Sequence, residues 1–189
     1  MKFSTIPAIL AFATTTLAAC YREGSVQLTF YGYPDNDPPS ANTAYNCGGR
    51  NYVAGGIGTY DDPLTMASAQ GEFNRCETIY VPYLEKYVRC KSTSSQTPIP
   101  SNDKLTGRET DEDYCQQCTD DFKSGKHHID VFTGSSKVSG GQEQINCEDR
   151  LTPDGDVVIV RNPDSSYAVD TTPLYYKVCY RKDECFRRD

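Results

Sequence analysis

Residues 111–134 contain most of the side chains in this sequence that could do chemistry. They include a Cys-x-x-Cys pair, a cluster of acidic residues, both histidines of the chain and a strand pattern. Within that pattern Asp130 stands between Ile129 and Val131, so strand alternation puts its carboxylate on the face opposite these two apolar side chains. A carboxylic acid held there could donate a proton to a glycosidic oxygen. Asp130 is therefore the first candidate for a catalytic residue.

Asp113 and Asp62 are the candidates for a second catalytic carboxylate, which glycoside hydrolases of the usual type require. Asp113 ends an acidic run just before Cys115. Asp62 follows a glycine-rich turn and precedes Pro63, which disfavours a helical conformation at Asp62. The alternative is that these carboxylates cap turns and accept hydrogen bonds from backbone N–H groups.

The close cysteine pair, Cys115 and Cys118, allows three interpretations. In an intracellular protein the pair would suggest zinc binding or redox chemistry. His127 and His128 follow in the sequence, but at a spacing that fits no standard zinc finger. In a secreted protein the two cysteines are more simply explained as part of a structural disulfide framework. We expect the latter, with no metal ion and no cofactor.

Five residues are candidates for sugar binding. Four lie in two segments before residue 111, and the fifth is a histidine. Tyr80 and Tyr83 could form a flat aromatic platform for the apolar faces of sugar rings, although tyrosines at such positions often only fill one face of a sheet. Tyr60 and Asp61 follow the glycine-rich turn. His127 and His128 would point to opposite faces of the strand, so one of them should lie near Asp130, and His128 is the candidate for substrate contact. We expect these five residues to contact a substrate.

Alternating apolar and polar residues predict at least six short strands, at residues 25–33, 78–83, 87–90, 128–132, 156–160 and 174–180. Residues 64–69 fit either a strand or the start of a short helix. Residues 91–110 are rich in Ser, Thr, Pro and charge, and this stretch is longer than most loops of compact domains, so we interpret it as an insertion. This pattern predicts an all-β barrel or sandwich.

The composition indicates a secreted protein of one domain. Residues 1–19 have a lysine, a short apolar segment and a small-residue cleavage site, as in a secretory signal peptide. The chain has 189 residues and a net charge of -7, so no basic face is available for nucleic acid or anionic membranes. We therefore expect an extracellular monomer whose partner is a neutral polysaccharide or a host surface protein.

Nine cysteines make the disulfide framework a further prediction. Cys20 is the odd one, and with the three residues before it also fits a bacterial lipidation signal. The remaining eight should form about four disulfides, and only one local pair, Cys179 with Cys185, can be suggested from spacing. The eight are Cys47, Cys76, Cys90, Cys115, Cys118, Cys147, Cys179 and Cys185.

Several short motifs resemble secreted fungal proteins of the double-psi β-barrel type, over roughly residues 25–152. This superfamily includes barwin, expansins, family 45 endoglucanases, rare lipoprotein A and the three-aspartate domain of a lytic transglycosylase. The motifs are Gly58-Thr59-Tyr60-Asp61-Asp62-Pro63, Ile79-Tyr80-Val81-Pro82-Tyr83, Glu112-Asp113-Tyr114-Cys115, His128-Ile129-Asp130 and Cys147-Glu148-Asp149-Arg150-Leu151-Thr152.

The resemblance implies a six-stranded double-psi β-barrel with long loops, stabilised by disulfides and crossed by a polysaccharide groove. After the signal peptide (1–19), the resemblance assigns residues 20–152 to the barrel, with the 91–110 insertion. Because the resemblance fades after residue 152, we expect residues 153–189 to form a C-terminal extension that wraps outside the barrel. The resemblance assigns the catalytic acid of the family's enzymes to Asp130. The three-aspartate pattern would place the other two at Asp113 and at Asp61 or Asp62.

Three functions are compatible with the sequence. The first is a non-catalytic secreted protein that associates with cell-wall polysaccharide and could act as an effector or elicitor of plant defence. It is favoured because the Asp-x-Gly-Gly run expected after the middle aspartate is replaced by Asp113-Tyr114-Cys115. The alternative is a glycan-cleaving enzyme, a lytic transglycosylase or endoglucanase, with Asp130 as general acid. A protease inhibitor or other protein-binding module is the third.

Overall fold

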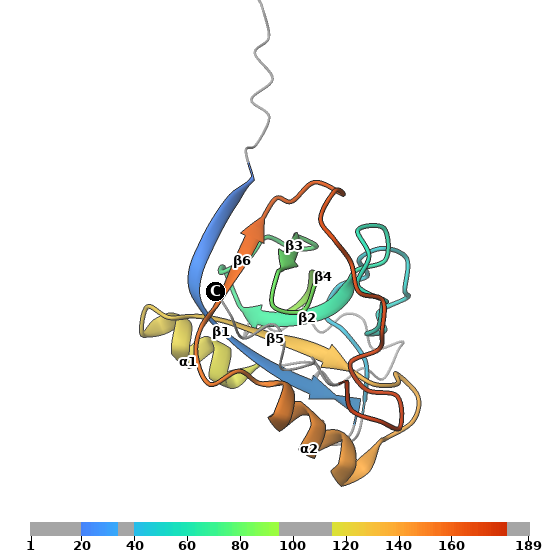
Figure 1. Ribbon diagram of the computed structural model, residues 1–189. Helices are drawn as coiled ribbons and strands as arrows, with labels where there is room; N and C mark the ends of the chain where they lie inside the picture. Colours follow the sequence, from blue (N-terminus) through green and yellow to red (C-terminus); the bar gives the residue numbers. More distant parts are fainter. Residues whose placement is uncertain (1–19, 34–39, 95–114, 181–189) are drawn as a thin grey trace, which may run out of the picture.

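A closed six-stranded barrel forms the body of the protein in the computed structural model, which describes residues 20–33, 40–94 and 115–180 (Figure 1). Around the barrel the strands follow the order β1-β5-β2-β4-β3-β6, and β6 closes it against β1. The β1/β5 and β2/β4 pairs are parallel, and the other pairs are antiparallel. The strands are β1 (Tyr21–Gly32), β2 (Leu64–Ala69), β3 (Thr78–Val81), β4 (Lys86–Ser94), β5 (His127–Thr133) and β6 (Val157–Arg161).

Strand alternation explains the barrel interior. In β1 the side chains of Val26 and Leu28 are buried, and in β5 those of Ile129 and Val131 are buried. Together with apolar residues of the four remaining strands they form one continuous core. Successive residues of a strand point to opposite faces, so every second side chain faces the barrel interior. The expected all-β barrel is confirmed, and residues 64–69 are a strand.

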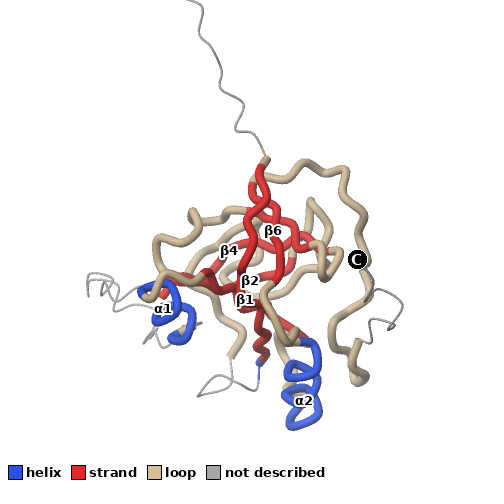
Figure 2. The backbone as a smooth tube through the Cα atoms, turned by 60° about the vertical axis from the view of Figure 1, so that its left-hand side comes forward, coloured by secondary structure: helices blue, strands red, loops and turns tan. Residues whose placement is uncertain are grey.

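Two short helices flank the lower end of β1 as drawn in Figure 2, with α1 (Gln116–Lys123) packed against β5 and β2 and α2 (Gly141–Leu151) packed against β1. The sequence did not indicate α2, because two of its four buried residues are polar, Gln144 and Glu148, and leave no apolar stripe. Gln144 donates to the carbonyl of Thr133 at 3.2 Å, and Thr133 donates to Glu148. The helix therefore docks on the barrel through hydrogen bonds to the end of β5 as well as through the buried side chains of Cys147 and Leu151.

The chain after residue 152 differs from the prediction. The barrel does not end at residue 152, because β6 is its sixth strand and pairs with both β1 and β3. Of the predicted extension, the described residues after β6, 162–180, lie outside the barrel sheet. Residues 174–180 do not form the expected strand and contain only an isolated bridge between Tyr175 and Cys179. Residues 1–19 and 95–110 lie outside the described residues.

Three disulfides join described residues: Cys47–Cys76, Cys115–Cys118 and Cys147–Cys179. The suggested Cys179–Cys185 pair is wrong, since Cys179 is bonded to Cys147; Cys185 lies outside the described residues. Cys90, expected in a disulfide, is instead buried with its sulfur 3.6 Å from Ser68 Oγ.

Among the described residues, no helix has both the length and the apolar character needed to cross a membrane.

Candidate functional site

Four polar side chains form a hydrogen-bonded chain on the outer face of β1 and β5. Thr29 and Asp130 are neighbours in the parallel pairing of these strands, and His128 lies two residues before Asp130, on the same face. Thr29 Oγ1 lies 2.8 Å from Asp130 Oδ1 and 2.8 Å from His128 Nε2. His128 Nδ1 lies 2.7 Å from Asp121 Oδ2, which α1 supplies. The prediction that one of the two histidines lies near Asp130 is confirmed, and that histidine is His128.

The chain links His128 to Asp130 through the Thr29 hydroxyl, which donates to Asp130 Oδ1. A neutral His128 whose Nδ1–H donates to Asp121 can accept from Thr29 at Nε2 only if the Thr29 hydroxyl turns away from Asp130, which must then carry a proton to donate to Thr29. When Asp130 is ionised, Thr29 donates to Asp130 and an imidazolium donates at both nitrogens. Both states hold the same number of protons, so the Thr29 hydroxyl connects a base to an acid.

Burial favours the neutral form of His128. Its side chain is fully buried. Burial lowers the pKa of His128 below its ordinary value, and the opposing effect of Asp121 does not restore it. Because Asp130 and Thr29 are only half-buried, the outer end of the chain remains within reach of solvent.

The buried neutral histidine predicts a pH effect on stability. The folded pKa of His128 is lower than the unfolded value near 6.5, so its contribution to stability is fully present above pH 6.5 and decreases below it. The free energy of unfolding should therefore fall by up to about 1.4 kcal/mol per pH unit below that point. Urea unfolding between pH 7 and 5 measures this slope.

The His128→Gln substitution should flatten the pH dependence of the free energy of unfolding. The His127→Gln substitution leaves His128 in place and should retain this pH dependence. Glu72 acts in the opposite direction, because burial raises its pKa despite the hydrogen bonds that it accepts. The informative quantity is thus the difference between wild-type and His128→Gln curves. Identical curves would contradict a buried neutral His128.

The Cys115–Cys118 disulfide lies beside the same histidine. The Sγ atoms of Cys115 and Cys118 and a ring nitrogen of His128 all lie within 4.8 Å of one another, and the three residues are buried. This is the group of described residues that comes nearest to a metal site. Sulfurs joined in a disulfide are not thiolates, however, and thiolates are what zinc requires. In this oxidised form the group is a disulfide next to an imidazole.

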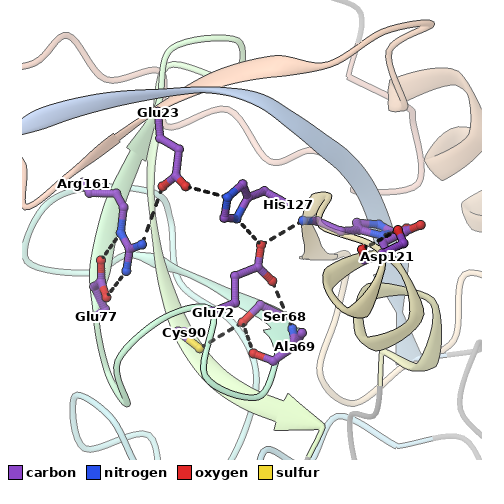
Figure 3. Close-up of polar contacts among 11 residues, drawn as sticks. Glu23, Ser68, Ala69, Glu72, Glu77, Cys90, Asp121, His127 and Arg161 are labelled. Carbon is purple, nitrogen blue, oxygen red and sulfur yellow. Dashed lines mark hydrogen bonds and ion pairs between the residues drawn. The ribbon is translucent and has the colours of Figure 1, made fainter.

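A second polar chain runs from β6 to β5 (Figure 3). Arg161 makes two hydrogen bonds of 2.7 Å to Glu77 and lies 3.5 Å from Glu23. His127 bridges Glu23 at 3.0 Å and Glu72 at 3.2 Å. Burial works against ionisation of Glu77, but hydrogen bonds, above all from Arg161, keep its pKa below the ordinary value.

Glu72 connects this second chain to the first. Its side chain is completely buried, and it accepts hydrogen bonds from the backbone N–H groups of Ala69 and His128 at 3.2 and 2.9 Å. The carboxylate thus ties the turn after β2 to the start of β5, where His127 and His128 lie.

A surface hollow of about 390 Å³ lies at the Arg161 end of the second chain. Tyr21 and Tyr60 line it and expose 52% and 40% of their surfaces, so both rings are accessible. The ring of Tyr60 packs edge-on against Tyr87 with centroids 5.3 Å apart, which fixes its position. The other lining residues are Asn74, Glu77, Thr78, Arg161, Asn162 and Pro163.

The remaining predicted residues do not join these groups. Asp62 forms an ion pair with Arg50, and Asp61 is exposed. Asp113 lies outside the described residues.

The expected tyrosine platform is not open to solvent. Tyr80 is 5% exposed, stacks on Tyr167 at 4.6 Å and donates to the carbonyl of Ala168. Tyr83 is half-buried and donates to the carbonyl of Leu151. These tyrosines pack later parts of the chain against the barrel, so Tyr60 alone of the predicted tyrosines lines the hollow.

Sequence reasoning missed Thr29, Asp121, Glu72 and Arg161. Thr29 is an ordinary strand residue by type, and Asp121 is one of several acidic residues in its region. Glu72 and Arg161 gain their partners from strands far away in the sequence. The one usable signal was the His-x-Asp spacing in β5, which predicts a shared face.

The sequence pattern of the DDB_G0273701 N-terminal domain family matches residues 23–106 and 109–186 of this chain. A Dictyostelium discoideum protein, the uncharacterized protein DDB_G0273701/DDB_G0273221, is 34% identical over 150 residues. The match covers 79% of this chain and 55% of the relative, so the chain spans about half of that relative's length. No solved structure matches the chain. The chain belongs to the DDB_G0273701 N-terminal domain family.

Proposed function

We propose that this protein is a secreted glycan-binding protein that associates with cell-wall polysaccharide through the hollow between Tyr21 and Tyr60. The observation that carries the proposal is the pairing of two exposed aromatic rings, that of Tyr60 held by Tyr87, with the polar groups of Glu77 and Arg161 in one hollow. Sugar rings present apolar C–H faces to aromatic rings and hydroxyls to such polar groups. A pocket that combines both can orient a sugar.

The rest of the chain supports this proposal. The net charge of -7 suits a neutral ligand better than a polyanion. The leader-like residues 1–19 and the disulfides agree with an extracellular location. The closed six-stranded barrel is also compatible with the resemblance to barwin and expansins.

Tyr60→Ala should weaken glycan binding by up to about tenfold, because one stacked aromatic contact contributes on the order of 0.5–1.5 kcal/mol. Tyr21→Ala should have a similar effect. Pull-down on insoluble chitin, cellulose and β-glucan, followed by calorimetry with a soluble oligosaccharide of the retained polymer, measures the loss.

Tyr176→Ala is the matched control, since Tyr176 is 74% exposed and lies outside the hollow. Melting curves should show that all three variants are folded. Retention on none of the polymers, or equal retention by the Tyr60→Ala and Tyr176→Ala variants, would refute the proposal.

A second candidate is glycan cleavage with Asp130 as general acid. It is favoured by the chain from Asp121 through His128 and Thr29 to Asp130, because this chain can return a proton to Asp130 after each transfer. A binding protein has no need of such a proton connection.

If cleavage occurs, Asp130→Asn should abolish the release of reducing ends or anhydro-sugars from a retained polymer, a loss of about a hundredfold or more. Retention on the polymer should persist, since Asp130 does not line the hollow. Asp154→Asn makes the same chemical change at an exposed turn and should leave product release unchanged. A wild-type protein that releases no product, or an equally active Asp130→Asn variant, would exclude this candidate.

A further inference from the structure

We propose that the Cys115–Cys118 bond is a redox-active disulfide, which exchanges with thiols of a partner next to the imidazole of His128. This activity is independent of glycan binding, because neither cysteine lines the hollow. The chemical class of partner is a free thiol pair on a peptide or a small thiol such as glutathione.

The first argument is the position of the pair at the start of α1. Cys115 is the N-cap of this eight-residue helix, and the backbone N–H of Cys118 points at Cys115 Sγ over 3.1 Å. Helix N-termini and N–H donors stabilise a thiolate, so Cys115 is the better leaving and attacking sulfur. Cys115 is also the more accessible of the two, 9% exposed against 0% for Cys118.

The second argument is the imidazole. A ring nitrogen of His128 lies within 4.8 Å of both sulfurs. Asp121, on the same helix as the pair, holds His128 Nδ1 at 2.7 Å and therefore fixes the ring beside the sulfurs. A fixed imidazole next to a cysteine pair can accept and return the proton that thiol–disulfide exchange requires.

The third argument is the contrast with the other two disulfides. Cys47–Cys76 and Cys147–Cys179 join residues 29 and 32 positions apart and connect separate parts of the fold. Cys115–Cys118 spans three positions within a single helix start. Opening it frees no long loop and separates no element, so of the three disulfides between described residues it is the one whose opening should disturb the fold least.

The exchange balances as two successive displacements. A partner thiolate attacks Cys115 Sγ, the new S–S bond forms, and the Cys115–Cys118 bond breaks with its electron pair on Cys118 Sγ, which takes up a proton. A second partner thiolate then attacks the partner's sulfur in this mixed disulfide and releases Cys115 as a thiolate. In total, one protein disulfide and two partner thiols give a protein dithiol and a partner disulfide.

The test uses the folded, oxidised protein in buffers of increasing ratio of reduced to oxidised glutathione. Acid quenching, alkylation and mass spectrometry then report the redox state of each cysteine pair. Cys115–Cys118 should become a dithiol at a ratio at least about tenfold lower than the other two disulfides, with circular dichroism unchanged. Reduction of all three disulfides together, accompanied by unfolding, would overturn the proposal.

Alkylation rates of the reduced pair give the second readout. At pH 7 Cys115 should react with iodoacetamide at least about tenfold faster than Cys118. His128→Gln should slow this reaction several-fold and move its pH profile upward, whereas His127→Gln should not. Should His128→Gln fail to fold, Asp121→Asn provides the same comparison with the imidazole retained. Equal rates at the two cysteines, or a profile that neither substitution changes, would reject the role of His128.

Discussion

Replacing Gly56 by alanine should lower the free energy of unfolding by about 3–5 kcal/mol, a large part of the total stability of a domain of this size. Gly56 has a φ of +114°, which residues with a side chain rarely adopt. An added Cβ would also lie 2.5 Å from the carbonyl carbon of Pro63 and 2.9 Å from Leu64 Cα. These are backbone atoms at the start of β2, so no side-chain rotation relieves the overlap.

The Gly56→Ala substitution should also weaken glycan binding at the hollow. The turn that contains Gly56 is closed by hydrogen bonds from the N–H groups of Ile57 and Gly58 to the carbonyl of Asp62, at 3.1 and 3.0 Å. Tyr60 lies between these partners, so a displaced turn moves a ring that lines the hollow. Urea unfolding and glycan pull-down of the Gly56→Ala protein measure both effects.

The Gly71→Ala substitution distinguishes the cost of a positive φ from the cost of steric overlap with the added Cβ. Gly71 also has a positive φ, +85°, but no atom lies within 4 Å of its added Cβ. It should therefore cost only about 1 kcal/mol. If the two substitutions prove equally mild, the close packing of Gly56 on Pro63 is wrong.

The barrel could be predicted from the sequence because its strands alternate. Residues around Val26, Ile79 and Ile129 have apolar side chains at every second position, and these side chains fill the interior. The helix α2 could not be predicted in the same way, since it docks partly through Gln144 and Glu148. The sixth strand was present in the strand pattern at residues 156–160, but the fading family resemblance misplaced it outside the barrel.

The sequence predicted only those parts of the candidate site whose residues are close together along the chain. Asp130 and His128 are two residues apart in one strand, so their shared face follows from sequence. Thr29 and Asp121 reach them from another strand and from a helix. The covering of Tyr80 by Tyr167 was equally inaccessible, because a stacking contact between residues so far apart leaves no signal in spacing.

Removing the Cys147–Cys179 disulfide, as Cys147→Ala/Cys179→Ala, should cost roughly 3–4 kcal/mol, because the bond closes a long loop in the unfolded chain. The same change at Cys115 and Cys118, a short loop, should cost roughly 2 kcal/mol or less. Both values follow from the chain-entropy estimate, and chemical unfolding of the two double variants measures their difference.

The location of the damage distinguishes this prediction from a general loss of stability. The disulfide ties α2 to the segment that carries Leu174 and Tyr180, and Leu174 is part of the main core. The hydroxyl of Tyr180 donates to Asp170 at 2.6 Å and is the main cause that lowers the pKa of Asp170 to about 2. When the segment loosens, that pKa should rise towards the ordinary value.

An NMR titration of the folded Cys147→Ala/Cys179→Ala protein therefore reports whether the segment has detached. The Asp170 signal should titrate at higher pH in this variant and stay near pH 2 in the Cys115→Ala/Cys118→Ala protein. An unchanged Asp170 in both variants would mean that Leu174 and the hydrogen bond from Tyr180 hold the segment without the disulfide. The stability difference between the variants would then come from the unfolded chain alone.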